Sequence, residues 1–398
     1  MKRRQLIKAA ATFATAATLS TTALISTGFA ADDVFRVVVL GGLSAKGILA
    51  DNSSTSVLAA QAGAEIVNKN GGIGGKKVVV EVLDDQANPT VAVTKLREAI
   101  NSSSKPDAVL NSGPSTIAEA TLPIINQAGI LSFNIGPTKT SWDAAKFPLN
   151  FDLSPAPANY ASGFLDYIKV KGYKSVGIIH GNSAYGEALG TLMEKTVSEG
   201  GVTVTAKEGY DYSALDMTPQ LDKIKSTNPE ALIVDGYGSV VGYVLQGIQK
   251  LGWDIPLLGD NSIAATGLIS KTPPDGVLGT DAVKNLVMQV FSSTKYDPDA
   301  TGVNEAVATM KSLGPIKASL ILAYNYDALA LMAAAAEAAG STDAKAMAAA
   351  LETDAVTTAA KTEILKKYNF SKESHAANPS NDSFAFIAPS ELKDGQYQ

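Results

Sequence analysis

The stretch from Asp107 to Thr140 reads DAVLNSGPSTIAEATLPIINQAGILSFNIGPTKT and contains one pattern twice. A short apolar run ends in Gly113-Pro114 and opens a helical pattern, and a second apolar run ends in Gly136-Pro137. We interpret each run as a strand that turns sharply and leaves a small hydroxyl residue, Ser115 or Thr138, at the turn.

The two turns predict part of a binding site for an anion such as a carboxylate. After the first turn, unpaired N–H groups at the helix start point outward and favour negative charge. In an open α/β sheet the carboxyl ends of neighbouring strands lie together, and ligands bind there. The simpler alternative is that Ser115 and Thr138 only cap a helix and a turn.

The composition bounds the class of protein. The chain has 398 residues, more than one core of ordinary size holds, so two domains are expected. It contains no Cys and two His, His180 and His375. Disulfides, thiolate metal sites, thiol nucleophiles and a His-rich metal centre are therefore excluded. We expect neither a cofactor nor a metal.

Residues 1–30 have the features of a cleaved signal peptide. A basic start is followed by an Ala/Thr/Leu run and by Gly28-Phe29-Ala30, which supplies small residues for cleavage. The Arg3-Arg4 pair resembles a twin-arginine signal, with ordinary export as the alternative. A membrane anchor is the other interpretation of the run, and its many Thr and Ser residues argue against it. We expect a soluble periplasmic protein.

Removal of residues 1–30 leaves 29 basic and 39 acidic residues, a net charge of −10. Such a chain has no electrostatic basis for binding nucleic acid.

The rest of the chain alternates strand and helix patterns. Expected strands at 34–40 and 77–83 alternate with helices at 56–68 and 91–100, which predicts βαβ units and a parallel sheet. A second series follows the Pro-marked linker at 154–157. The prediction is an α/β fold with two doubly wound parallel-sheet lobes.

The tail after Gly276 is too short to form a domain, so its pieces complete the two lobes. We expect residues 31–153 plus 284–360 in lobe 1, and 154–283 plus 361–398 in lobe 2. A chain that crosses between lobes several times makes a hinge around a cleft.

A set of short motifs in a fixed order carries a family resemblance. The motifs are Asn70-Gly71-Gly72-Ile73-Gly74-Gly75-Lys76, Asp84-Asp85-Gln86, Gly113-Pro114-Ser115, Ala184-Tyr185-Gly186, Asp235-Gly236-Tyr237 and Tyr326-Asp327-Ala328. As a set, the chain resembles the type I periplasmic solute-binding proteins of the branched-chain-amino-acid-binding branch.

This resemblance implies two lobes joined by three crossovers that close on a ligand. It also implies that the protein is not an enzyme, and that it delivers its ligand to the membrane permease of an ABC importer. We expect a monomer.

The resemblance also implies roles for particular residues. The Ser115 hydroxyl, the backbone at Gly136 and the Thr138 hydroxyl correspond to groups that hold a ligand carboxylate. Tyr185 and Tyr237 correspond to aromatic residues that cover the ligand, although both could be ordinary half-buried tyrosines.

One position departs from the family pattern. Amino-acid binders of this family hold the ligand ammonium with an acidic residue after the short strand of lobe 2, where this chain has Asn261, with Asp260 one residue before. If Asn261 occupies the site, burying an ammonium is costly, and an aromatic or aliphatic acid without an amino group fits better. If Asp260 takes the role, an amino acid remains possible.

At the mouth of lobe 1, Asp51 and Asn52 fall where the family often has a ligand-facing aromatic residue. This replacement suggests a smaller or more polar end to the ligand.

Two other functions stay open at this point. One is a sensory module that presents its bound state to a membrane receptor. The other is an exported hydrolase that uses Ser115, although the G-x-S-x-G turn of such enzymes is absent.

Overall fold

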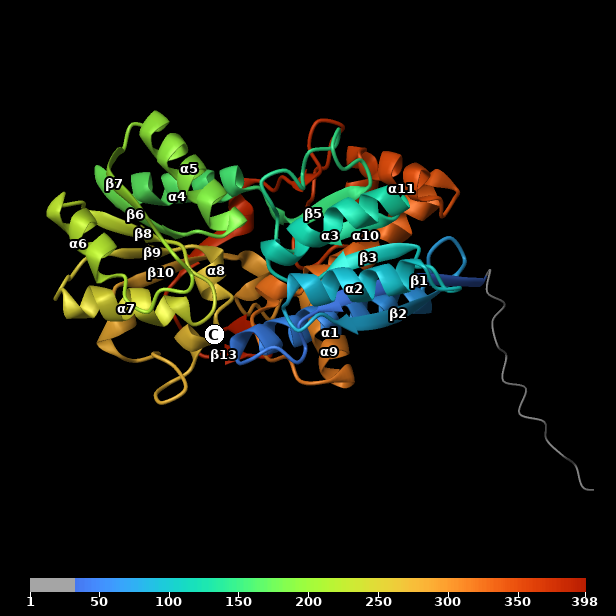
Figure 1. Ribbon diagram of the computed structural model, residues 1–398, viewed down its shortest axis with the longest axis horizontal. Helices are drawn as coiled ribbons and strands as arrows, with labels where there is room; N and C mark the ends of the chain where they lie inside the picture. Colours follow the sequence, from blue (N-terminus) through green and yellow to red (C-terminus); the bar gives the residue numbers. More distant parts are fainter. Residues whose placement is uncertain (1–32) are drawn as a thin grey trace, which may run out of the picture.

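The computed structural model describes residues 33–398, so the expected signal peptide at 1–30 lies outside the described residues. Two lobes lie side by side, each built on a six-stranded sheet with helices on both faces (Figure 1). This arrangement confirms the predicted α/β fold. None of the helices within 33–398 is long and apolar enough to cross a membrane.

The sheet of lobe 1 has the strand order β11-β5-β4-β3-β1-β2, and every neighbouring pair is parallel. The strands are β1 (Val34–Gly41), β2 (Lys77–Asp84), β3 (Ala108–Asn111), β4 (Leu131–Asn134), β5 (Asn150–Pro155) and β11 (Ala376–Ala377). Strands β3, β4 and β5 are buried along their whole length, as a parallel sheet covered on both faces requires.

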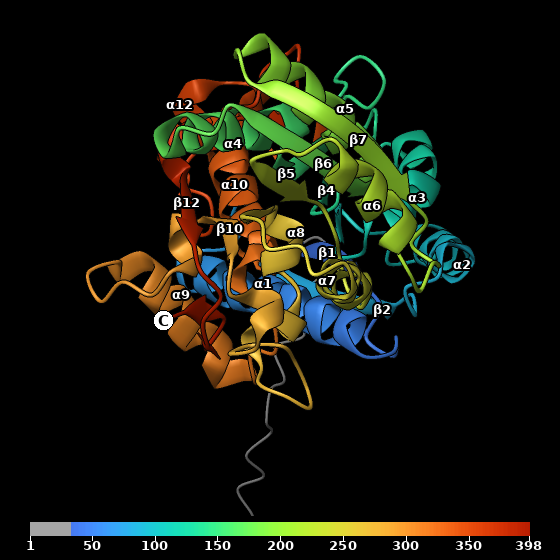
Figure 2. The same ribbon diagram turned by 90° about the vertical axis from the view of Figure 1, so that its left-hand side faces the viewer.

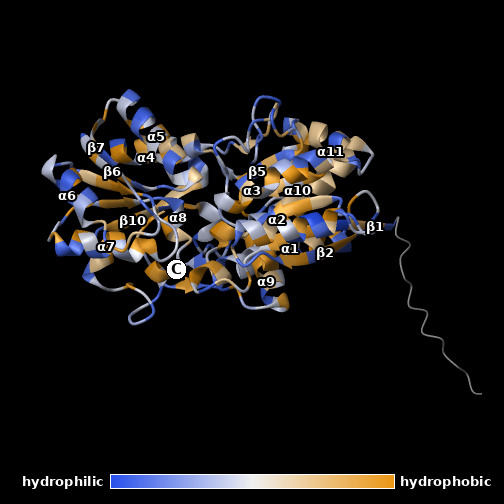
Figure 3. Cartoon of the chain, in the orientation of Figure 1, coloured by the Kyte–Doolittle hydropathy of each residue, from blue (hydrophilic) through white to orange (hydrophobic). Residues whose placement is uncertain are grey.

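Helices α2 (Pro89–Ile100) and α3 (Ser115–Ala128) cover one face of this sheet, where Leu96 and Ile125 pack on strand β1. The other face is covered by α1 (Ile48–Lys69) and α10 (Tyr324–Ala339). Three more helices complete this side: α9 (Thr301–Leu313), α11 (Ala344–Leu351) and α12 (Asp354–Ala359). Most of these helices carry both hydrophobic and hydrophilic residues, as expected of helices between a core and solvent (Figure 3).

The sheet of lobe 2 has the order β12-β10-β9-β8-β6-β7, and only β12 is antiparallel to its neighbour among these strands. The strands are β6 (Ser175–Gly181), β7 (Thr203–Tyr210), β8 (Ala231–Val234), β9 (Leu257–Gly259), β10 (Leu286–Phe291) and β12 (Phe384–Ile387). The flanking helices are α4 (Pro157–Lys171), α5 (Ala184–Glu199), α6 (Thr218–Ser226) and α7 (Val240–Lys250) (Figure 2). A one-turn helix, α8 (Asn261–Ala264), follows β9.

The chain crosses between the sheets three times, after β5, after β10 and between β11 and β12. The expected division of the chain between the lobes is wrong for two strands. Strand β10 was expected in lobe 1 (284–360), but it pairs with β9 in the second sheet. Strand β11 was expected in lobe 2 (361–398), but it pairs with β5 in the first. An apolar strand fits either sheet, so only the pairing decides its lobe.

The C-terminal hairpin of β13 (Leu392–Lys393) and β14 (Gln396–Tyr397) lies where the lobes meet (Figure 1). The Leu320 N–H donates to the Gly395 carbonyl at 2.8 Å. The Tyr397 hydroxyl donates to the carbonyl of Ala264, the last residue of α8 in lobe 2. The hairpin is therefore attached to segments that belong to both lobes.

Helices α1 and α10 pack closely at Gly63. A Cβ placed there would lie 2.8 Å from the Tyr326 carbonyl oxygen and 3.1 Å from its Cα. Because the obstacle is backbone, Gly63→Val should lower the free energy of unfolding by about 1–3 kcal/mol. Gln61→Val, on the exposed side of the same helix, controls for the β-branched side chain. Equal urea midpoints for the two variants would contradict close packing at this crossing.

Candidate ligand-binding site

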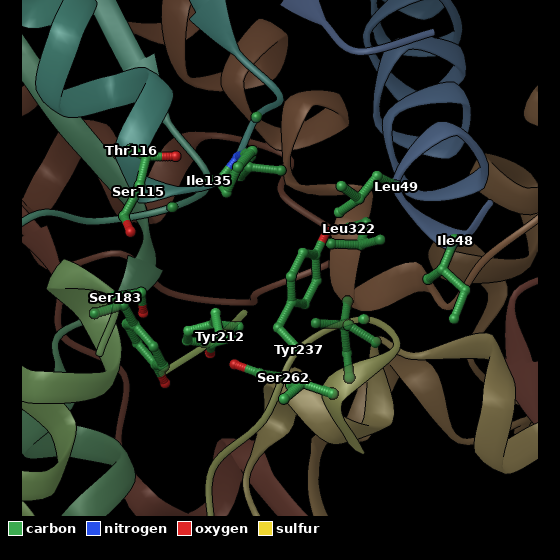
Figure 4. A pocket seen from close by; sticks show the side chains of 18 of the residues that line it. Ile48, Leu49, Ser115, Thr116, Ile135, Ser183, Tyr212, Tyr237, Ser262 and Leu322 are labelled. Atoms are coloured by element: carbon green, nitrogen blue, oxygen red, sulfur yellow. The ribbon is translucent and has the colours of Figure 1, made fainter. Parts of the chain in front are cut away.

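A cavity of about 670 Å³ lies between the two lobes. Most of its wall comes from loops that follow strands, because the carboxyl ends of both parallel sheets face the cleft. Figure 4 shows Ser115 and Thr116 of lobe 1 across the cavity from Tyr212 and Ser262 of lobe 2. The lining residues are Lys46–Leu49, Gly113–Thr116, Ile135–Pro137, Ser154, Asn182, Ser183, Tyr185, Tyr212, Tyr237–Val240, Asn261, Ser262, Ala265, Ile321, Leu322 and Tyr324.

The lobe 1 wall contains the start of helix α3. Its N-cap is Pro114, which provides no side-chain hydrogen bond to the first turn. The Ser115 hydroxyl lines the cavity and has no hydrogen-bond partner within residues 33–398. These free donors at a positively polarised helix end suit an anionic group.

Gly136 brings the second turn against this helix end. A Cβ at Gly136 would lie 2.8 Å from the Ser115 nitrogen and 3.1 Å from the Gly113 carbonyl oxygen. The two turns singled out in the sequence are therefore in contact, and only glycine allows this distance.

Thr138 does not line the cavity. Its hydroxyl oxygen accepts hydrogen bonds from the N–H groups of Ser141 at 3.0 Å and Thr140 at 3.3 Å, and its own N–H donates to the Ser141 hydroxyl at 2.7 Å. This residue stabilises the turn after β4. The structure thus places Ser115 and Gly136 in the cleft wall, and Thr138 in the turn behind it.

A buried carboxyl on strand β5, that of Asp152, is hydrogen-bonded to this turn. The Ser141 hydroxyl donates to it at 2.6 Å, and the side-chain amides of Asn134 and Asn150 donate at 3.2 and 3.3 Å. Burial nevertheless raises the pKa of Asp152 to about 6. Asp152, Ser141 and Thr138 therefore form one hydrogen-bonded chain from the sheet to the turn behind the cleft wall.

The lobe 2 wall contains both tyrosines expected from the sequence. Tyr185 lies in the first turn of α5, and its hydroxyl donates to the side-chain oxygen of Asn261 at 3.1 Å. Tyr237 follows β8, and its hydroxyl is hydrogen-bonded to the side chain of Asn52 at 2.7 Å. Both rings are half-buried and line the cavity.

Asn52 links the two lobes rather than lining the cavity. With its amide oriented so that the oxygen accepts from Tyr237, its nitrogen donates to the carbonyls of Ala265 and Ile48, both at 3.3 Å. Asn52 lies on α1 of lobe 1, whereas Tyr237 and Ala265 belong to lobe 2. This side chain therefore contacts lobe 2 through two of its residues.

A second contact between the lobes lies in more exposed positions. The Lys139 ammonium is 2.5 Å from the carboxylate of Glu187, in the first turn of α5. The hydrogen bond and charge of Lys139 lower the pKa of Glu187, and Glu187 raises the pKa of Lys139.

Asn261 and Asp260 differ in exposure to the cavity. Asn261 lines it, accepting from Tyr185 and donating to the Tyr160 hydroxyl at 3.0 Å. Asp260 is fully buried and caps α8 by accepting from the Ile263 N–H at 3.3 Å. Of the two residues at the family's acidic position, the neutral one faces the cleft.

A family model described as periplasmic binding protein matches residues 35–385. The chain belongs to this family. It is 26% identical, over 71% of its length and 74% of the relative's, to Leu/Ile/Val-binding protein homolog 3 of Brucella melitensis.

Two solved structures share the fold. The periplasmic binding protein type 1 of Bordetella pertussis has a TM-score of 0.74 at 22% identity, over 89% of this chain and 96% of that one. The other is a solute-binding protein of an ABC transporter from Rhodopseudomonas palustris, in complex with 3,4-dihydroxybenzoic acid. It has a TM-score of 0.65 at 21% identity, over 80% of this chain and 85% of that one.

This periplasmic binding protein has lining residues that the sequence interpretation missed. Tyr212 follows strand β7, so the rule that ligands meet the carboxyl ends of strands could have found it. Leu322 lies between α9 and α10, and Tyr324 is the first residue of α10. No local pattern marks those two residues.

Neither histidine lies in the cleft wall. His180 bonds the neighbouring Gly181 carbonyl at 3.0 Å. His375 is fully buried in lobe 1, where it bonds the Asn150 carbonyl at 2.8 Å and Glu352 at 3.2 Å. A serine hydrolase would need a histidine beside its nucleophile, and among the residues that line the described cleft Ser115 has none. Similar proteins in this family are named as binding proteins.

The raised pKa of Asp152 predicts a pH-dependent stability. The pKa of this carboxyl is about 6 in the folded protein, against an ordinary value of 3.8 in the unfolded chain. Its contribution to stability therefore falls as pH rises through this window. Relative to Asp152→Asn, wild-type protein should lose on the order of 3 kcal/mol between pH 3.8 and 6. Urea unfolding of both proteins across this pH range measures the change. A difference in unfolding free energy that stays constant with pH would contradict the expectation.

Proposed function

We propose that this periplasmic binding protein is the substrate-binding component of an ABC importer, and that it binds a small solute through a carboxylate group. The observation that carries the proposal is the lobe 1 wall, where the uncapped start of α3 meets Gly136 beside the free Ser115 hydroxyl. Backbone N–H groups and a hydroxyl at a helix start form a site for one negative group. The permease of the importer is the proposed partner.

The proposal leaves two ligand classes, amino acids and amino-free acids. Relatives are named for Leu, Ile and Val, and one structural neighbour holds 3,4-dihydroxybenzoic acid. Both classes carry a carboxylate, which is the group that the lobe 1 wall suits.

A thermal-shift screen of the mature protein against carboxylic acids and their uncharged analogues tests the proposal. A ligand at a hundredfold its dissociation constant adds about 2.7 kcal/mol to stability, which raises the melting point by several degrees. Binding should be stoichiometric and without turnover. Shifts with uncharged analogues alone would contradict the carboxylate assignment.

A sensory role would use the same binding cleft. Uptake of the identified ligand after deletion of the protein separates the two roles. Unimpaired uptake would point to sensing, whereas lost uptake supports transport.

Ser115→Ala removes one donor from the lobe 1 wall. If this hydroxyl donates to a buried carboxylate, binding should weaken by on the order of 1–3 kcal/mol. Calorimetric titration measures the change, and Ser104→Ala at an exposed position is the matched control. Equal affinity of the two variants would remove Ser115 from the site.

Glu187→Gln breaks the ion pair between the lobes. Because both partners are about half exposed, ligand affinity should fall by at most about fivefold at low salt, and the difference should vanish at high salt. Glu194 lies on the same helix as Glu187 but pairs with Lys207 of its own lobe. Glu194→Gln should therefore leave ligand affinity unchanged. An equal loss in both variants would show that the Lys139 contact does not act on closure.

A further inference from the structure

The lobe 2 wall offers a ligand no negative charge. Of the described residues that line the cleft, Lys46 alone is charged, and it is exposed on lobe 1. A ligand ammonium enclosed in this cleft would lose its hydration without gaining a counter-charge, which is costly.

Two buried carboxyls in the same loops are directed elsewhere. Asp235 accepts from the Gly181 N–H at 2.9 Å, and Asp260 accepts from the Ile263 N–H. The remaining oxygens, Asp235 Oδ1 and Asp260 Oδ2, have no donor among the described residues. Burial raises the pKa of both groups, and the charge of Asp235 raises the pKa of Asp260 further. Neither carboxyl lines the cavity.

Four polar residues of the cavity wall belong to a neutral network that is centred on the buried Tyr160 hydroxyl. The Asn261 side chain joins the Tyr185 and Tyr160 hydroxyls. The Tyr160 hydroxyl also lies 3.0 Å from the Ser154 hydroxyl and 3.3 Å from that of Tyr324. Hydroxyl and amide groups both donate and accept, so this network can bond a neutral hydroxyl of a ligand.

The remainder of the wall is aromatic and aliphatic. Tyr185, Tyr212 and Tyr237 line the lobe 2 side. Ile135 and Leu322 line the cavity from lobe 1, across from Tyr212 and Tyr237 (Figure 4). Tyrosine faces and branched aliphatic chains suit a flat apolar ring.

We propose, on the basis of the proposed function, that the ligand is an aromatic carboxylic acid without an amino group, and that it carries a ring hydroxyl. The carboxylate lies on the lobe 1 wall at Ser115 and Gly136. The ring packs among the tyrosines, and its hydroxyl bonds the neutral network around Asn261. Asn261 disfavours amino acids, because its neutral amide supplies no negative charge to offset the cost of burying an ammonium.

Calorimetric titration of the mature protein with matched pairs tests this assignment. Hydrocinnamate against phenylalanine and isocaproate against leucine differ in the amino group, and para-hydroxybenzoate against benzoate differs in the ring hydroxyl. We expect each amino-free acid to bind at least about tenfold more tightly than its amino acid. We expect para-hydroxybenzoate to exceed benzoate by about twofold to tenfold. Leucine or phenylalanine binding as tightly as its amino-free partner would overturn the inference.

Two variants test which residues of the cleft discriminate between the paired ligands. Asn261→Asp supplies the missing charge with almost no change of shape, so at about pH 8 it should narrow or reverse the preference for hydrocinnamate over phenylalanine. Asn126→Asp, the same change at an exposed position of α3, should leave the preference unchanged. Tyr185→Phe keeps the ring and should abolish the advantage of para-hydroxybenzoate over benzoate. Unaltered preferences in both site variants would overturn the inference.

The outcomes separate the inference from the proposed function. Tight binding of amino acids, lost in Ser115→Ala, would leave the carboxylate site in place and reject the aromatic acid. Binding of benzyl alcohol but of none of these acids would reject the carboxylate site itself. Failure of all these compounds to bind would reject the inferred ligand class.

Discussion

The cleft depends on one property of parallel sheets, which is that neighbouring strands end at the same edge. In both lobes this edge faces the other lobe, so the loops after strands become the opposing walls of one cavity. Ser115 and Gly136 follow β3 and β4, while Tyr237 and Asn261 follow β8 and β9. An antiparallel sheet would alternate these loops between two edges and leave half of them away from the ligand.

The strand ends also explain how much of the site the sequence reveals. Ser115, Gly136, Tyr185, Tyr237 and Asn261 all line the cavity, in loops after strands or in first turns of helices. The Gly-Pro pairs mark the turns at Ser115 and Gly136 in the sequence. The two tyrosines and Asn261 were assigned from the family resemblance. Asn52 was expected to face the ligand, and it lies instead between the lobes, where only the packed structure reveals its partners. Thr138 was expected in the site for the same reasons as Ser115, but its hydroxyl serves the local turn.

Strand β5 is the main element that was not predicted from the sequence. Its residues Asn150, Asp152 and Ser154 are polar and yet buried, whereas strand patterns are recognised by their apolar and β-branched residues. The polar side chains are tolerated because each has a hydrogen-bond partner. Asn150 and Asp152 bond each other and Ser141 of the neighbouring turn, and the Ser154 hydroxyl is bonded to that of Tyr160. Tyr324 was missed for another reason, since it enters the cleft from a segment far away in the chain.

The three crossings have a mechanical consequence. Three separate chain segments that bridge two rigid bodies resist twist and sliding far more than bending, so the lobes retain essentially one rotational degree of freedom. The C-terminal hairpin is bonded at Gly395 and Tyr397 to segments of both lobes and so adds a further link between them. A receptor with a single opening coordinate presents one reproducible closed shape to whatever it docks on, even if the ligands that close it differ.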